Sequence, residues 1–275
     1  MHFLIAVSAI FGSILLRLVL VKIDWLSVWV KFILSPLLVL TTAIALVSMG
    51  NQGSMFGRHL GLLSTTAYMG AWSFLLFSLI WLGIKGYQGW YSLQHLQQLQ
   101  PHTWQGQSYL LLESDRLVAA QVGFWHSQLV LSKGIFQQLS PDHINAIICH
   151  ETAHVYYRDT FWFFWWAWLK EITGWLPHSQ QLWTELLLFR ELRADYWAKQ
   201  QSDHLLLAES LLYLAQDRYH PQWQMALSAS ASDRLEQRIV YLLSPENTCP
   251  YVPTLQIWLI PLGLLPLLSI PFHSF

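Results

Sequence analysis

The sequence predicts a mainly α-helical membrane protein, in which a small α+β domain lies between the third and fourth of four transmembrane helices. Three observations predict this class. Only 11% of the 275 residues are charged, whereas soluble domains normally carry about a quarter. The apolar residues gather in four long runs, and strand and helix patterns fill the more polar stretch between the third and fourth runs.

Each apolar run is long enough to cross a bilayer, which takes roughly 20 helical residues. The runs are Phe3–Val21, Phe32–Met49, Leu62–Ile84 and Thr254–Phe272. The first run lacks the basic start and the A-x-A-like exit of a signal peptide, so an uncleaved anchor is favoured over that alternative. Three prolines in the last run predict a kinked or irregular helix.

The distribution of Lys and Arg predicts the orientation in the membrane. Four cations lie on one side of the predicted spans, if Arg17 snorkels toward it: Arg17, Lys22, Lys31 and Lys85. The loop between the second and third runs carries only Arg58. The positive-inside rule then places both termini outside and Lys85–Pro253 in the cytoplasm, in a plasma (inner) membrane.

The chain is expected to divide into four parts. Residues 1–85 hold three spans, residues 86–107 form a linker with a short helix, residues 108–248 form the candidate zinc domain, and residues 249–275 carry the fourth span. Short β-prone runs predict a small antiparallel sheet in the third part, and they are Ser108–Glu113, Leu117–Val122 and Gln128–Ser132. Helices are expected at about 141–158, 181–200, 202–217 and 232–243.

A helix start at Ser140-Pro141-Asp142 precedes the strongest motif, His150-Glu151-Thr152-Ala153-His154. Histidines four apart on a helix project from one face, so both imidazoles can reach one metal ion. Glu151 is placed to accept a proton from a metal-bound water. The motif predicts that His150 and His154 bind Zn²⁺ and that Glu151 is the catalytic base; the alternative is a polar, solvated helix face.

A catalytic zinc needs a third protein ligand and an open position. The metzincin extension requires Gly and His where the chain has Tyr157 and Thr160, which excludes that class. Glu191 and Asp195, four residues apart on a later predicted helix, supply carboxylates instead. We expect Glu191 to bind the metal and Asp195 to orient a ligand histidine. The alternative is a pair of solvated acids between arginines.

The zinc motif belongs to a longer pattern that continues with Tyr157-Arg158-Asp159, Trp175-Leu176-Pro177 and Leu187-Leu188-Phe189-Arg190-Glu191-Leu192-Arg193-Ala194-Asp195. This pattern, with three apolar runs before it and one after it, resembles the BlaR/MecR-type antirepressor metallopeptidases. The resemblance implies a gluzincin-like peptidase domain at the cytoplasmic face, with a regulatory repressor as substrate. Those relatives carry a penicillin-binding sensor domain after the last run, whereas this sequence stops at Phe275, so we expect no β-lactam stimulus.

The HtpX-type and CaaX-processing membrane peptidases are similar as well, because they share the zinc motif and the later E-x-x-x-D. They usually carry His-Pro before a final Arg-Ile, where this chain has Ser228-Ala229-Ser230. That departure favours the first family. The alternatives are an HtpX-like processing or quality-control peptidase and a non-catalytic metal-binding membrane sensor or scaffold.

Two further segments have more than one interpretation. The aromatic stretch Phe161–Leu176 is expected to lie in the membrane interface and to clamp the site against the membrane. Its alternatives are an aromatic core and a re-entrant hairpin with Leu182–Phe189. The strand Gln128–Ser132 is a candidate edge on which a peptide substrate adds.

Two charged residues outside the main motifs also have more than one interpretation. Asp159 either supports the metal site or is structural, and Arg238 either pairs with a charge near the site, touches substrate or is structural. Zn²⁺ is the one cofactor expected. A protein or peptide substrate and the lipid bilayer are the expected partners, and the net charge of −1 gives no reason to expect nucleic acid.

Overall fold

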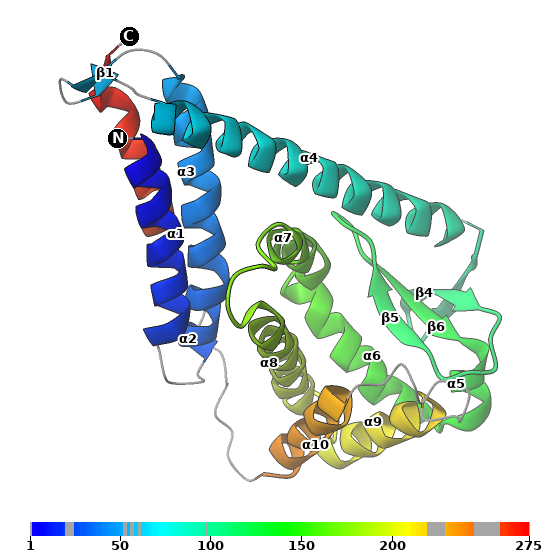
Figure 1. The fold of residues 1–275 in the computed structure, drawn as a ribbon. Coiled ribbons are helices and arrows are strands. Elements are labelled where there is room, and N and C mark those ends of the chain that lie inside the picture. The colour runs from blue at the N-terminus through cyan, green and yellow to red at the C-terminus, as the bar shows by residue number, and fades with distance from the viewer. Residues whose placement is uncertain are drawn as a thin grey trace. The chain divides into compact units, whose positions relative to one another are not determined.

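The structure is a computed structural model, and it describes residues 2–19, 25–51, 54–55, 58–59, 62–96, 98–218, 229–244 and 259–274. The chain divides into two units, each built from segments that are not contiguous in the sequence. The first comprises Met1–Lys85, Trp166–Leu186 and Val252–Phe275, and the second comprises Gly86–Trp165 and Leu187–Tyr251. The prediction of a mainly helical protein with a small sheet is confirmed (Figure 1).

Apolar helices build the first unit. Helix α1 (His2–Val19) packs along α3 (Ser35–Met49), which continues from α2 (Trp25–Trp29) through a π-helical turn at Val30–Leu34. Helix α4 is Leu62–Leu96. Near the C-terminus, α11 (Ile260–Gly263) and a 3₁₀ helix (Leu265–Phe272) contact α3. Three two-residue strands, not predicted, form a sheet in the order β2-β1-β7: β1 (Ser54–Met55), β2 (Arg58–His59) and β7 (His273–Ser274).

Two helices are long and apolar enough to cross a membrane, Trp25–Met49 with 25 residues and Leu62–Leu96 with 35. The first predicted span forms α1, a shorter apolar helix. The predicted fourth span starts outside the described residues. Its described part is α11 and the 3₁₀ helix with Pro271 inside it, so the irregular helix is confirmed there. Four spans stay a prediction.

Arg17 does not extend toward water. Its side chain is only 3% exposed, and its Nε donates to Ser35 Oγ at 2.7 Å. The Nη1 atom donates to Pro177 O at 3.0 Å and to Ser179 Oγ. The expected snorkelling is therefore wrong for this residue, because oxygens at the start of α8 (Ser179–Lys199) and in α3 satisfy the guanidinium inside the first unit.

The second unit contains a four-stranded sheet in the order β3-β4-β6-β5. Its strands are β3 (Gln100–Trp104), β4 (Gln107–Leu112), β5 (Ala119–Val122) and β6 (Gln128–Ser132). The prediction of an antiparallel sheet is wrong for one pair, because β4 and β6 run parallel. β6 lies between β4 and β5, so β3 and β5 are the edge strands, and the prediction of an edge at Gln128–Ser132 is wrong.

Residues 86–107, expected to be a linker with a short helix, instead form the end of a long helix and part of a β-hairpin. Helix α4 runs on to Leu96, and β3 pairs with β4 through a tight turn at Gln105 and Gly106. Both turn residues have positive φ, 47° and 87°, as the two central residues of a type I′ hairpin do. Gln-Gly is a weak turn signal, which is why the sequence did not predict the hairpin.

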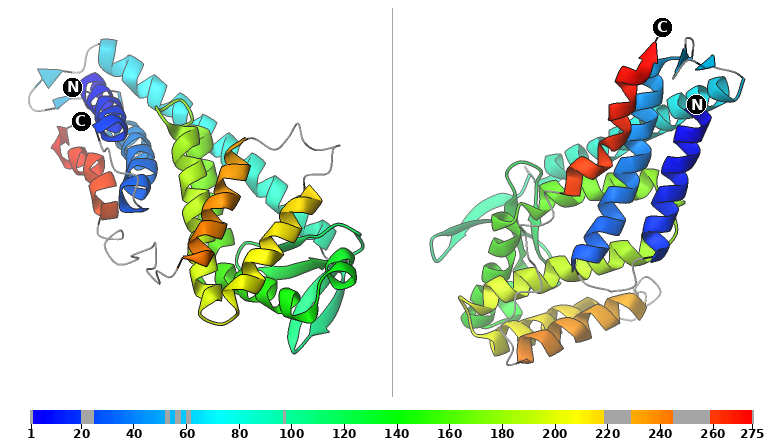
Figure 2. Two further views of the ribbon diagram at one scale, coloured as in Figure 1. Left: turned by 90° about the horizontal axis from the view of Figure 1, so that it is seen from below. Right: turned by 90° about the vertical axis from the view of Figure 1, so that its left-hand side faces the viewer.

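Six helices follow this sheet in the chain: α5 (Lys133–Gln138), α6 (Pro141–Tyr156), α7 (Asp159–Ile172), α8, α9 (His204–Arg218) and α10 (Ala229–Leu243). The second half of α7 and the start of α8 belong to the first unit. The four predicted helices are confirmed within a few residues, whereas α5 and α7 were not predicted as helices. α6 lies against α9, and α9 lies beside α10 (Figure 2). In α7, Phe163 is buried but Trp162 is 48% exposed, so this segment is partly core and partly surface.

The core of the second unit fills the space between the sheet and α6. Leu131 on β6 and Ile135 on α5 are 0% exposed and belong to one cluster with Ile144 and Ile147 of α6. This packing fixes α6, the helix that carries the zinc motif, against the sheet.

We predict that Leu131→Ala lowers the free energy of unfolding by about 2–5 kcal/mol, because it leaves a cavity in this core. The exposed Gln137→Ala is the control and should change it by less than about 0.5 kcal/mol. Pulse proteolysis of the full chain in urea measures both. Equal midpoints for the two variants would contradict the assigned core.

Candidate metal centre

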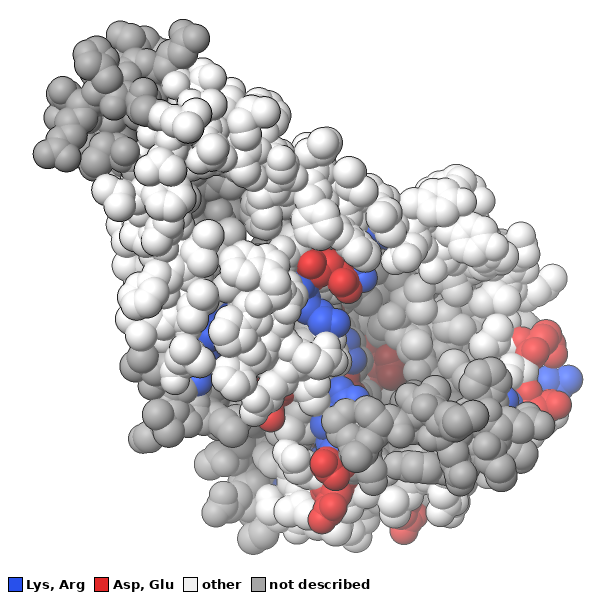
Figure 3. Space-filling view, viewed as in Figure 1, with Lys and Arg blue, Asp and Glu red and all other residues white. Residues whose placement is uncertain are grey.

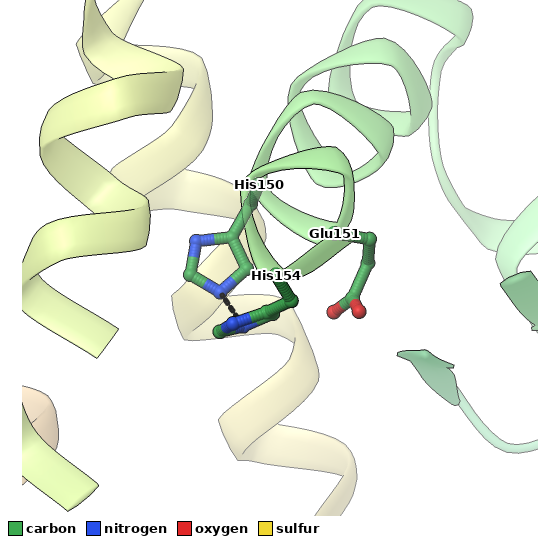
Figure 4. Close-up of side chains that lie close together, drawn as sticks. All are labelled: His150, Glu151 and His154. Atoms are coloured by element: carbon green, nitrogen blue, oxygen red, sulfur yellow. Dashed lines mark hydrogen bonds between the residues drawn. The ribbon is translucent and has the colours of Figure 1, made fainter. Parts of the chain in front are cut away.

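Helix α6 brings the two motif histidines together. Ser140 caps the helix by accepting from His143 N, as predicted. His150, Glu151 and His154 are all buried, and the two Nε2 atoms lie 3.2 Å apart (Figure 4). Among the described residues these three form a group whose ligand atoms lie within 4.8 Å of one another and could hold a metal ion.

Glu191 on α8 faces the same point. Its Oε2 lies 3.4 Å from His150 Nε2, and its Oε1 lies 4.0 Å from His154 Nε2. Ligand atoms about 2.0–2.2 Å from a tetrahedral zinc are themselves about 3.3–3.6 Å apart. The separations from His150 Nε2 to His154 Nε2 and to Glu191 Oε2, 3.2 and 3.4 Å, are close to this range, whereas the 4.0 Å between His154 Nε2 and Glu191 Oε1 is longer. Two imidazoles and one carboxylate are also a donor set of catalytic zinc sites.

A carboxylate lies against the outer nitrogen of each histidine. Asp195 Oδ1 is 2.9 Å from His150 Nδ1, and Asp159 Oδ2 is 2.7 Å from His154 Nδ1. A carboxylate there keeps the proton on Nδ1 and leaves the Nε2 lone pair for a metal. The sequence predicted this position for Asp195. For Asp159 it left a structural role open, and the structure places Asp159 on His154.

The turn between α6 and α7 explains how Asp159 reaches His154. Arg158 has a φ of +53°, in the left-handed region that non-glycine residues seldom adopt. This residue ends α6 and changes the direction of the chain, and Asp159, the first residue of α7, contacts the histidine five positions earlier. No local pattern in the sequence indicates this conformation for an arginine.

Arginines pair with the buried carboxylates. Arg238 on α10 binds Asp195 through Nε at 2.7 Å and Glu191 through Nη1 at 3.1 Å. Arg190 binds Glu191 Oε1 at 2.6 Å. Arg193 pairs with Asp159 and also lies over a tyrosine ring at 4.0 Å.

These pairs decide between two readings of the sequence. The alternative of two solvated acids is wrong, because Asp195 is 0% exposed and Glu191 is largely covered. Of the three roles considered for Arg238, pairing with a charge near the site is the one observed.

The arginines control the ionisation of the acids. Burial raises the pKa of Glu191, but Arg190 and Arg238 outweigh it and hold this pKa well below its usual range. Burial likewise raises the pKa of Asp195, and Arg238 more than offsets it. Burial lowers the pKa of His150, yet Asp195 and Glu191 reverse the effect and raise it to about 9.

The charges at the centre are nearly balanced. Four carboxylates meet three guanidinium groups there: Glu151, Asp159, Glu191 and Asp195 with Arg190, Arg193 and Arg238. Because the pKa of His150 is raised to about 9, that imidazole can carry the balancing proton, and a bound metal ion would replace it.

A pocket of about 450 Å³ opens over the centre. Its wall includes the edge strand β5 at Ala119, Ala120 and Gln121, and Arg234 and Leu235 of α10. In Figure 3 most of the visible surface carries no charged side chain, and blue and red side chains appear near the centre and at the right-hand and lower edges. The pocket therefore lies between the outer edge of β5 and the charged cluster.

Comparison with known proteins supports a metal-dependent peptidase. Residues 96–176 match the profile of Peptidase family M48, a metallopeptidase family. The matched segment contains the sheet, the zinc motif and Asp159, and it ends before Glu191 and Asp195. No curated protein and no solved structure matches the chain. The match gives no support to the BlaR/MecR-type resemblance in particular.

We predict that Asp195→Asn weakens zinc binding by about 10–100-fold, because His150 loses the charge that orients it. Asp142→Asn is a matched control, since Asp142 is an exposed acid on α6, and it should leave the affinity unchanged. Titration of the full chain in detergent against a chromophoric chelator measures both. Wild-type affinity in Asp195→Asn would remove Asp195 from the site.

Proposed function

We propose that the chain is an integral-membrane zinc metalloendopeptidase that hydrolyses peptide bonds of a protein substrate near the cytoplasmic face. The observation that carries this proposal is the convergence of His150, His154 and Glu191 in a pocket that Glu151 also lines. The first three would hold the metal, and Glu151 remains free of it as the base.

The protein's own side chains have distinct tasks in this reaction. When bound by His150, His154 and Glu191, Zn²⁺ would supply Lewis acidity toward the scissile carbonyl and a water molecule. Glu151 takes the proton of the attacking water and delivers it to the leaving amine. Asp195 and Asp159 keep the two imidazoles in the orientation that exposes Nε2.

The substrate would add to β5 as an extra strand. Ser132 N donates to Val118 O at 2.9 Å, so the peptide groups of Val118 face β6. Because peptide groups alternate in an antiparallel pair, those of Ala119 and Gln121 face the open edge. Gln121 Oε1 is also buried without a hydrogen-bond partner. An extended peptide can form hydrogen bonds with these backbone groups whatever the peptide's own sequence is.

Several features support the membrane location and the substrate class. Two helices have the length and composition of spans, and the positions of Lys and Arg favour a cytoplasmic catalytic domain. The BlaR/MecR-type resemblance favours a regulatory repressor as substrate, and the HtpX-type resemblance favours processing or quality control of membrane proteins. Cleavage products that are lost in a Glu151→Gln strain distinguish the two.

We predict that Glu151→Gln retains zinc but hydrolyses peptide bonds about 10²–10⁴-fold more slowly, because the general base is lost. His150→Ala should lose both zinc and activity. Metal analysis and single-turnover peptide cleavage by the purified full chain measure these effects. Unchanged cleavage by Glu151→Gln would contradict the proposed mechanism. An unchanged cellular effect of the same variant would favour a non-catalytic sensor or scaffold.

We predict that Gln121→Pro lowers kcat/KM for an extended peptide by roughly two- to tenfold more than Gln121→Ala does, because proline removes one backbone donor. The alanine variant is the matched control, since it removes only the side chain. Equal losses in the two variants would show that the backbone of β5 does not bind the substrate.

A further inference from the structure

Six aromatic side chains from two distant segments form one surface cluster, which we call the aromatic patch. Two come from the turn between β5 and β6 and four from the first half of α7: Phe124, Trp125, Phe161, Trp162, Phe164 and Trp165. All six belong to the second unit.

Phe124 is the centre of the patch. Its ring centroid lies 5.1 Å from that of Phe161 and 4.9 Å from that of Phe164. Trp125 packs on Phe161 at 5.0 Å, and Trp162 packs on Phe161 at 5.2 Å. Rings at these separations are in direct contact. The turn and the helix therefore present one continuous apolar surface.

The patch is open to its surroundings. Trp125 is 73% exposed and Trp162 is 48% exposed, and no member of the patch is fully buried. None of the six carries a charge, and neither does any residue from Phe161 to Leu169. A contiguous exposed apolar surface of this kind indicates that something covers it.

The turn between β5 and β6 has a tight backbone conformation that exposes Trp125. Gly123 has a φ of +146°, and a Cβ placed on it would lie 2.4 Å from His126 O. Only glycine allows the chain to turn so tightly here. The turn therefore holds Phe124 against α7 and leaves Trp125 projecting, next to a strand whose earlier residues line the pocket.

We propose that the aromatic patch inserts into the interfacial region of the lipid bilayer and holds the catalytic pocket at the membrane surface. Trp and Phe without charges match this region, where an apolar ring is buried and the indole N–H stays hydrated.

The chain also links the patch to the apolar helices. Helix α7 begins in the second unit and continues into the first, which holds Trp25–Met49 and most of Leu62–Leu96, the two helices long and apolar enough to cross a membrane. Combined with the proposed peptidase function, on which this consequence rests, the patch selects substrates with a cleavable segment close to the membrane.

Photo-crosslinking tests the contact directly. The full chain carries p-benzoylphenylalanine in place of Trp125, or of Trp162 in a second sample, and is reconstituted in phosphatidylcholine vesicles. The control has the same group at the exposed Gln137. We expect lipid adducts by mass spectrometry at 125 and 162 and none at 137. Adducts to polypeptide, no adducts, or equal lipid adducts at 137 would each overturn the proposal.

The same experiment on a Glu151→Gln background separates this proposal from the proposed function, because lipid contact needs no hydrolysis. In the active protein, we predict that Trp125→Gln lowers cleavage of a lipid-anchored peptide by about tenfold relative to the same peptide free in solution. Tyr213→Gln, which changes an exposed ring on α9, should leave that ratio unchanged. An unchanged ratio in Trp125→Gln contradicts the proposed role.

Discussion

Asp195 is completely buried between His150 and Arg238, and the arrangement of the second unit depends on this contact. Removing a carboxylate from water costs several kcal/mol unless its charges and lone pairs are matched. Matching them requires α6, α8 and α10 to meet at one point. One buried carboxylate therefore helps to fix the positions of three helices that are separated along the chain.

The same principle extends to the rest of the metal centre. Glu191 lies between Arg190 and Arg238, and Asp159 lies between His154 and an arginine of α8. The arginines keep the acids ionised, and the acids hold the imidazoles with Nε2 directed inward. Charges that would be unfavourable singly form a nearly balanced cluster, which a dication would complete.

Two elements connect this chemistry to the molecular surface. The edge strand β5 lines the pocket with its first residues and leads, after Val122, into the turn that displays Trp125. Helix α7 begins with Asp159 at the metal centre and continues with the rings of the aromatic patch. A contact made by the patch would therefore act on the two segments that border the pocket.

The sequence by itself determined what depends on neighbours within one helix or one apolar run. The 3.6-residue period puts His150 and His154 on one face, and Ser140 and Pro141 start that helix, because these are interactions across a few residues. The same local reasoning paired Glu191 with Asp195. It also located the apolar helices, although not all their ends.

Only the tertiary structure decided which distant groups meet. It placed β6 in the middle of the sheet and β5 at the edge, because strand order depends on pairing between separated segments. It brought Asp159 into contact with His154 through the positive φ of Arg158. It also paired Arg238 with two acids that lie over 40 residues earlier in the chain. Burial made these pairings necessary, and burial is a property of the folded chain that no short motif records.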